Sequence, residues 1–144
     1  MSLDITIRRV HEEDIPAIVD IDRKVVGQDR TPTWPQQASS HFRTYYPPLS
    51  YVAEVGGSVV GFILGDIRGA EYALPLSGWI DIVGVDREHH GQGIGHRLIE
   101  TFIHECRSPG IKARPIIREG DTLLQDFLSQ MGFHRGELME FVQD

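Results

Sequence analysis

The sequence contains one cysteine and no long hydrophobic run, and each absence narrows what the chain can be. Cys106 alone cannot form an internal disulfide or a multi-thiolate metal site, which fits a reducing compartment. No apolar stretch approaches the ~20 residues that a membrane-spanning helix needs, and no signal-peptide pattern begins the chain. We therefore expect a cytoplasmic protein without membrane insertion or a bound metal, in which Cys106 is a buried small hydrophobic residue.

Basic residues are also few, because 14 Lys and Arg stand against 21 Asp and Glu and leave a net charge of −7. A general nucleic-acid binder is disfavoured, since phosphate neutralisation requires clustered cations. An acidic surface instead favours a cationic substrate. The 144 residues, 40% hydrophobic and 24% charged, suffice for a single domain over residues 1–144.

Hydrophobic periodicity predicts an alternation of strands and helices. Apolar residues at every second position indicate strands, and spacings of three and four indicate helices. The dipeptide Gly56-Gly57 tolerates the positive φ angles of a tight hairpin, so the second to fourth strands are expected to form an antiparallel meander. The predicted strands are 5–7, 51–55, 59–67, 79–85, 112–118 and 133–141, and the predicted helices are 15–25, 36–46, 94–106 and 123–131.

A glycine-rich turn between a strand and a helix carries the strongest chemical signal. The first amides of a helix have no internal partners and carry partial positive charge, so they bind anions. Glycines at 91, 93 and 95 leave those amides open to a diphosphate. A Rossmann site needs a different spacing and a Walker loop needs Gly-Lys-Ser/Thr, so both are disfavoured. A plain tight turn and another kind of nucleotide site stay open.

Two motifs resemble the GNAT superfamily of N-acetyltransferases. Residues 85–95, VDREHHGQGIG, are similar to the family's Gln/Arg-x-x-Gly-x-Gly/Ala motif, and residues 127–133, FLSQMGF, are similar to a second family segment. The resemblance implies a GNAT-like α/β (α+β) domain with a mixed, mostly antiparallel sheet of six to seven strands and about four helices. The sheet would be splayed between strands four and five. It also implies an acetyl-CoA-dependent N-acetyltransferase that acetylates an amine directly in a ternary complex.

The resemblance assigns acetyl-CoA, the expected cosubstrate, to the end of strand four and the turn. The backbone there would pair with the pantetheine arm like an added strand, and one N–H would polarise the thioester carbonyl. Gly84 is also placed for a bulge or a close backbone approach. Pro115 either fits the opening of the sheet or ends an edge strand. The expected cofactor-binding residues are Val83, Gly84, Val85, His90, Gly91, Gln92, Gly93, Ile94, Gly95, His96 and Asp121, while His89 and Arg97 either balance phosphate charge or are solvated.

Three positions depart from the family pattern. His90 replaces the usual Gln or Arg, Asp121 replaces a frequent asparagine, and Leu128 replaces a frequent tyrosine that is thought to protonate the departing thiolate. A positioned general acid contributes roughly a hundred- to ten-thousand-fold, whereas a thiol with a pKa of about 8.5 is a tolerable leaving group without one. Leu128 therefore predicts slower turnover or another proton donor such as water, and it motivates the alternative of a non-catalytic CoA-binding sensor or interaction module with a GNAT fold.

Catalytic and acceptor-binding residues are less clearly marked. Asp81 is the preferred general base, because regular alternation would place it on the same face as Trp79, Val83 and Val85. Glu119 is the second candidate and a water relay the third, while a salt-bridged or solvated Asp81 is the structural alternative. The expected acceptor-binding residues, which could instead be surface anchors, are Arg30, Trp34, Tyr45 and Trp79. The acceptor amine stays open, as does the choice between a monomer and a homodimer.

Overall fold

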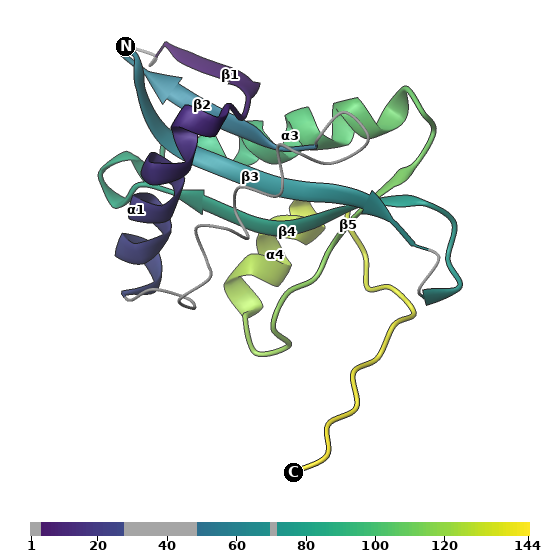
Figure 1. Ribbon diagram of the computed structural model, residues 1–144. Coiled ribbons are helices and arrows are strands. Elements are labelled where there is room, and N and C mark those ends of the chain that lie inside the picture. Colours follow the sequence, from purple (N-terminus) through teal and green to yellow (C-terminus); the bar gives the residue numbers. More distant parts are fainter. Residues whose placement is uncertain (1–3, 28–48, 70–71) are drawn as a thin grey trace.

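The computed structural model describes residues 4–27, 49–69 and 72–144, which form a sheet flanked by helices (Figure 1). The five strands occur in chain order as β1 (Ile5–Arg9), β2 (Tyr51–Val55), β3 (Ser58–Arg68), β4 (Ser77–Val85) and β5 (Lys112–Pro115). The helices are α1 (Ile15–Val26), α3 (Ile94–Arg107) and α4 (Thr122–Gln130), with short 3-10 turns η1 (Glu12–Asp14) and η3 (Arg87–His89). The described part contains no helix both long and apolar enough to cross a membrane.

The strands lie in the order β1-β2-β3-β4-β5. The first four are antiparallel to their neighbours, and β5 runs parallel to β4. Gly56 and Gly57 have φ angles of 59° and 80°, a left-handed conformation that glycine adopts readily, and they join β2 to β3. The predicted antiparallel meander of the second to fourth strands is confirmed.

β4 and β5 pair over only part of their length. The register runs from Ser77 opposite Lys112 to Ile80 opposite Pro115, and β4 then continues to Val85 while β5 has ended. The sheet thus opens between these strands, as the family resemblance implied. Pro115 both ends β5 and stands where the opening begins, so the two interpretations of this proline describe the same feature.

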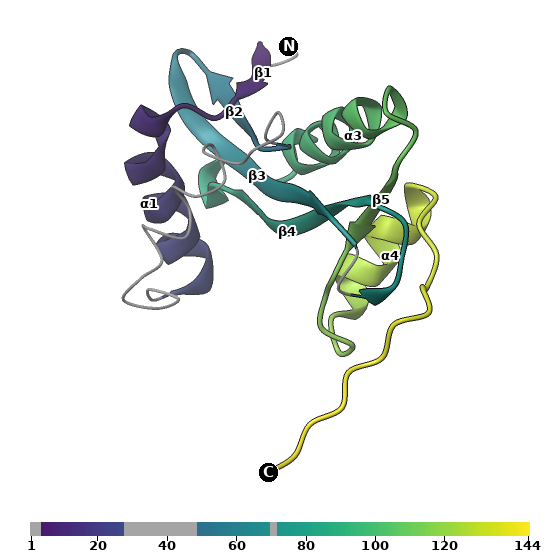
Figure 2. The same cartoon turned by 45° about the vertical axis from the view of Figure 1, so that its right-hand side comes forward.

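The helices cover both faces of the sheet (Figures 1 and 2). On one face α1 packs over Val52, Phe62 and Leu64, and on the other α3 and α4 pack over a larger cluster that includes the buried Leu128. Glycine allows α3 to approach closely, because a Cβ on Gly65 would lie 2.3 Å from a ring carbon of Phe102. Cys106 lies in this cluster and is 1% exposed, which confirms its prediction as a core residue.

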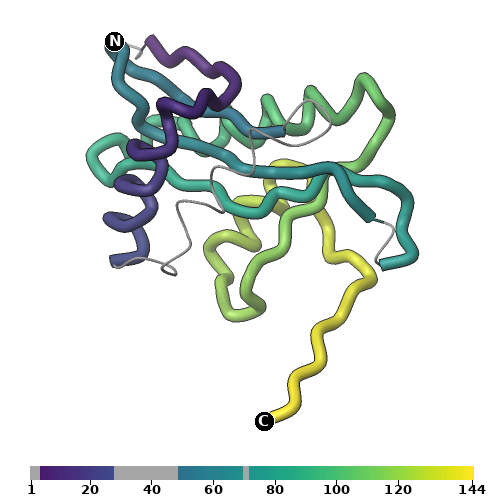
Figure 3. Tube along the Cα trace, viewed as in Figure 1, coloured from purple at the N-terminus to yellow at the C-terminus, as the bar shows by residue number. Residues whose placement is uncertain are grey.

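Two expectations about the sheet and helices are corrected. Within the described residues the sheet has five strands rather than six to seven, and three α-helices form rather than about four. The predicted helix 36–46 falls outside the described residues. The predicted strand 133–141 does not form: residues 134–144 run away from the sheet and are exposed (Figure 3). No strand of the described part pairs with them to supply the hydrogen bonds that a strand requires.

Candidate functional site

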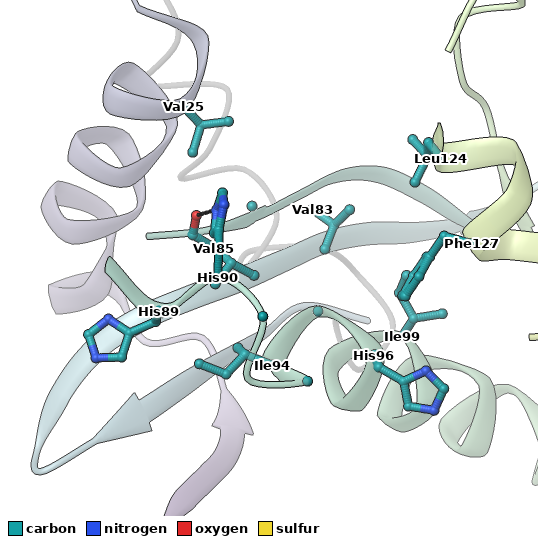
Figure 4. Close-up of a pocket in the computed structure, with 14 residues that line it drawn as sticks. Val25, Val83, Val85, His89, His90, Ile94, His96, Ile99, Leu124 and Phe127 are labelled. Atoms are coloured by element: carbon teal, nitrogen blue, oxygen red, sulfur yellow. Dashed lines mark hydrogen bonds between the residues drawn. The ribbon is translucent and has the colours of Figure 1, made fainter. Parts of the chain in front are cut away.

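A pocket of about 390 Å³ lies beside the unpaired end of β4 (Figure 4). Its walls come from β4, the turn into α3 and the inward side of α4. Although the chain carries a net charge of −7, none of the described residues that line the pocket is acidic. The pocket is lined by Val25, Val83, Gly84, Val85, His89, His90, Gly91, Gly93, Ile94, Gly95, His96, Ile99, Leu124 and Phe127.

The backbone of β4 faces this pocket with an edge that β5 does not reach. The amide of Asp86 donates to the carbonyl of Val60 at 2.8 Å, so alternation directs the backbone groups of Val83 and Val85 away from β3. The Nε2–H of His90 donates to the Val85 carbonyl at 2.7 Å, on that side. The end of β4 therefore offers strand-like backbone groups to a ligand.

The N-terminus of α3 opens into the same pocket. Gly93 is its N-cap, no side chain caps the helix, and its first turn holds no acidic residue. The first helical hydrogen bond runs from the amide of Arg97 to the carbonyl of Gly93 at 3.0 Å, so the amides of residues 94–96 precede the internal ladder. Uncapped amides and the helix dipole together make this end an anion site.

The three glycines of the turn, at positions 91, 93 and 95, differ in whether the structure requires glycine there. Gly91 and Gly93 both have φ of 78°, and a Cβ on either would meet no atom within 4 Å. Their backbone conformation thus requires glycine, and no atom of the described residues fills the space before them. Gly95 has no such need, because its added Cβ would make an ordinary contact of 3.7 Å with Val85.

The opposite end of the pocket is apolar. Val83 of β4, Ile99 of α3 and Phe127 of α4 face one another across it (Figure 4). His96, in the first turn of α3, lies edge-on to Phe127 at 6.1 Å between ring centroids and forms an ion pair with Glu100 at 2.5 Å when protonated. Nδ1 of His89 is buried without a hydrogen-bond partner in the described structure. An anion site thus continues into an apolar channel beside an open strand edge.

This combination defines a class of protein that binds a long cosubstrate with a diphosphate at one end and an amide-bearing arm at the other. Diphosphate oxygens fit the amides before α3, and an arm with peptide groups fits the edge of β4. The residues present therefore suit coenzyme A.

Comparison with known proteins agrees with the geometry. Residues 16–133 match the acetyltransferase (GNAT) family, so the chain belongs to that family and is an acetyl-CoA-dependent N-acetyltransferase. An uncharacterized N-acetyltransferase of Methanocaldococcus jannaschii is 30% identical over 139 residues, covering 92% of this chain and 80% of that protein.

Solved structures share the fold. The aminoglycoside N-acetyltransferase AAC(6')-Iy in complex with CoA superposes with a TM-score of 0.82 at 13% identity, covering 100% of this chain and 97% of that one. Arabidopsis thaliana Naa50, in complex with a bisubstrate analogue of CoA and a peptide, gives 0.74 at 14% identity, covering 94% and 86%. Both proteins have the same architecture as this chain, and their structures hold CoA in the first case and the bisubstrate analogue in the second.

Most of the predicted cofactor-binding residues lie together. Those that line the pocket are Val83, Gly84, Val85, His90, Gly91, Gly93, Ile94, Gly95 and His96, and His89 joins them. Gln92 is not among the lining residues. Asp121 is also outside, because it caps α4 by accepting from the amide of Leu124 at 3.1 Å. Arg97 points elsewhere and donates to the carbonyl of Ile5 at 2.9 Å.

Gly84 shows the close approach but not the bulge. A Cβ there would lie 2.8 Å from the ring of Phe62, which therefore packs directly over this glycine. The irregularity falls earlier on β4, where Leu64 faces Ile82 but Gly65 faces Ile80. Asp81 is the extra residue of this bulge.

The bulge corrects the expected position of Asp81. Alternation breaks there, so Val83 and Val85 pack with the cluster under α3, whereas Trp79 and Asp81 lie beside Arg68. Both carboxylate oxygens of Asp81 accept from Arg68, at 2.7 and 3.2 Å, and this hydrogen bonding raises the pKa of the guanidinium. Asp81 does not line the pocket. It forms an ion pair with Arg68, which is the structural alternative to a general base that the sequence analysis gave for this residue.

The remaining predicted residues lie away from the pocket. Trp79 is 2% exposed, and its Nε1–H donates to the carbonyl of Arg68 at 2.8 Å, so it is not an open substrate wall. Glu119 is exposed on the surface, 3.8 Å from Arg135. Leu128 is buried in the core. The expected acceptor-binding residues Arg30, Trp34 and Tyr45 fall outside the described residues.

Several lining residues were not predicted as part of a site. Val25 at the end of α1, Ile99 on α3, and Leu124 and Phe127 on α4 all carry the apolar spacing of a helix core. That spacing is the same whether a side chain packs against the sheet or against a ligand. No local signal in the sequence could separate the two roles.

Proposed function

We propose that this protein transfers an acetyl group from acetyl-CoA directly to an amine while both are bound. The observation that carries the proposal is the uncapped N-terminus of α3 beside the unpaired edge of β4. When bound, acetyl-CoA supplies a thioester whose carbonyl carbon is open to attack by a nucleophile. No acyl-enzyme is invoked, and the one cysteine is buried in the core.

The residues of the pocket would bind and orient the two substrates. Amides of residues 93–96 would hold the diphosphate, and the backbone of Val83 and Val85 would hold the arm by hydrogen bonds of the kind that join strands. A free N–H of this edge would polarise the thioester carbonyl. Ile99 and Phe127 would exclude water from the arm. Positioning of this kind supplies much of the rate of a direct transfer.

Water would take part both in removing the proton from the attacking amine and in protonating the departing thiolate. Asp81 stays the proposed base, acting through water, because Arg68 already occupies both carboxylate oxygens. Glu119, exposed on the loop after β5, is the second candidate. The buried side chain of Leu128 offers no proton to the thiolate, so water is the proposed donor there.

The proposed acceptor is an amine of a small molecule or of a protein, in the cytoplasm. The solved relatives include one named for aminoglycosides and one bound to an analogue that contains a peptide, and both kinds of acceptor are amines. The net charge of −7 supports a cationic acceptor. Arg30, Trp34 and Tyr45 remain the proposed acceptor wall, and a homodimer is the proposed assembly.

A thiol-release assay tests the proposal. Purified protein is mixed with acetyl-CoA and a panel of amines, and free CoA is followed with a chromogenic disulfide. Release that depends on one class of amine supports the transferase. Tight CoA binding in calorimetry without release for any amine would instead indicate a CoA sensor, and stronger binding of ATP or NAD than of CoA would contradict the assigned cosubstrate.

A further inference from the structure

His90 lies on the part of the β4 edge that the arm of the cosubstrate is proposed to use. Val85 turns both its N–H and its C=O away from β3, because the next residue, Asp86, makes the hydrogen bond to Val60. β5 ends opposite Ile80 and leaves this part of β4 unpaired. The Val85 carbonyl still has a donor, because Nε2 of His90 lies 2.7 Å from its oxygen (Figure 4).

The imidazole of His90 takes the place that a neighbouring strand would take. A carbonyl oxygen only accepts hydrogen bonds, so Nε2 carries the proton. The 2.7 Å distance is shorter than the roughly 2.9 Å between the backbone N and O atoms of paired strands. The ring therefore fills the space, about 4.8 Å from β4, in which the backbone of a paired strand lies. A second donor cannot approach the Val85 carbonyl from the same direction.

The side chain of His90 can leave this position without a change in the backbone. His90 is exposed, so solvent lies beside its ring. Its amide donates to the carbonyl of Arg87 at 3.2 Å, which holds the main chain of the residue independently of the ring. Rotation of the side chain to another staggered rotamer therefore releases the Val85 carbonyl and leaves the turn before α3 in place.

We propose that His90 is an internal competitor of the pantetheine arm, because its imidazole holds the Val85 carbonyl until an amide of the arm replaces it. The inference rests on the proposed function, since it concerns how the same pocket admits acetyl-CoA. The arm of coenzyme A has two amide groups, and each carries an N–H donor that can take the place of Nε2–H. The diphosphate, proposed to bind the amides before α3, does not need this carbonyl. His90 thus lowers the affinity for CoA and leaves the affinity for a diphosphate without an arm unchanged.

Calorimetry with CoA and with ADP tests the competition, since ADP carries a diphosphate and no arm. His90→Ala removes the competing donor. The net contribution of a hydrogen bond corresponds to roughly two- to tenfold in affinity, so CoA is expected to bind this variant more tightly by about that factor, with ADP affinity unchanged. His104→Ala removes an exposed histidine of α3 outside the pocket and is the matched control, which should change neither affinity.

Crystal structures of the wild-type protein with each ligand give a second readout that needs no variant. With CoA, an N–H of the arm is expected on the Val85 carbonyl and the ring of His90 is expected to have rotated away. With ADP, the ring should stay on the carbonyl. A CoA complex in which Nε2 still donates to Val85 would overturn the inference.

The binding data distinguish failure of this inference from failure of the proposed function. Weaker CoA binding by His90→Ala would show that the ring supports the cosubstrate, and equal binding would show that the arm does not use the Val85 carbonyl. A gain for CoA and ADP alike would place the competition at the diphosphate. Each of these results overturns the competition and leaves the proposed function standing, whereas a wild-type protein that does not bind CoA would overturn both.

Discussion

Replacing Gly93 by glutamate tests whether the turn before α3 holds a diphosphate. Gly93 has φ of 78°, and an added Cβ would meet no described atom within 4 Å, so the first atom of the new side chain enters open space. The left-handed backbone costs a residue other than glycine about 1–2 kcal/mol. This is small beside the ~5–15 kcal/mol of a typical domain, so we expect the variant to fold.

The cost to binding is larger than the cost to folding. The repulsion energy between a carboxylate and one unit of phosphate charge about 5 Å away is about 3 kcal/mol at an effective dielectric constant of about 20. One such unit corresponds to a change of roughly a hundredfold in affinity. The dissociation constant of CoA in calorimetry is therefore expected to rise by at least that factor.

Gly110→Glu is the matched control. Gly110 follows α3 at its other end, has φ of 73° and likewise meets no atom within 4 Å, but it does not line the pocket. The same backbone strain should lower the melting temperature of both variants, and more for Gly110→Glu because its carboxylate lies near the negative end of the α3 dipole, while the CoA affinity of Gly110→Glu stays near that of the wild type. Normal CoA binding by Gly93→Glu would refute the site, and an equal loss in both variants would trace the effect to folding.

Four further predictions follow from single side chains. Gly95→Ala should raise stability by up to about 1 kcal/mol in thermal unfolding, because alanine favours the helix and meets only an ordinary contact; a lower melting temperature would contradict that contact. Asp81→Asn should slow thiol release by about tenfold or more at neutral pH and shift the pH–rate profile upward with CoA affinity unchanged, whereas an unaltered profile removes it as the base. Burial raises the pKa of Cys106 to about 11, so at pH 8 roughly one thiol in a thousand is ionised; a chromogenic disulfide should react rapidly only after unfolding, and fast reaction with the native protein would contradict the packing. Burial alone would raise the pKa of Asp14, but hydrogen bonds from Arg8 and a backbone amide lower it below its usual value. Its stabilisation is thus present above about pH 4 and lost as the pH falls through the lowered pKa, and Asp14→Asn should cost about 1–3 kcal/mol at pH 7 in denaturant unfolding and flatten the acid limb.

Local patterns predicted the antiparallel meander and the turn. Alternation along β2 and β3 and the Gly56-Gly57 hairpin depend only on neighbouring residues, and so does the sequence of strand, glycine turn and helix around Gly93. The three strands of the meander and the pocket-lining turn accordingly lie where the sequence placed them.

The position of Asp81 depends on the partner strand and could not be predicted in the same way. The sequence of β4 is compatible with regular alternation, and the bulge arises from how Leu64 and Gly65 of β3 pair with it. The segment 133–141 failed as a strand for a related reason, because alternation does not show whether a neighbour exists. The apolar wall from α4 depends on how far β5 separates from β4, which is a long-range property.

The bulge at Asp81 decides which peptide groups of β4 are available. Were the ladder regular beyond Ile80, the amides of Val83 and Val85 would turn toward β3 and be consumed in the sheet, and Ile82 and Gly84 would take their place at the open edge. Gly84 has no side chain to wall the channel, and Phe62 would lose the glycine over which its ring packs. The additional residue in β4 thus allows the same strand to present the backbone of Val83 and Val85 to a cosubstrate while Gly84 packs under Phe62 in the core.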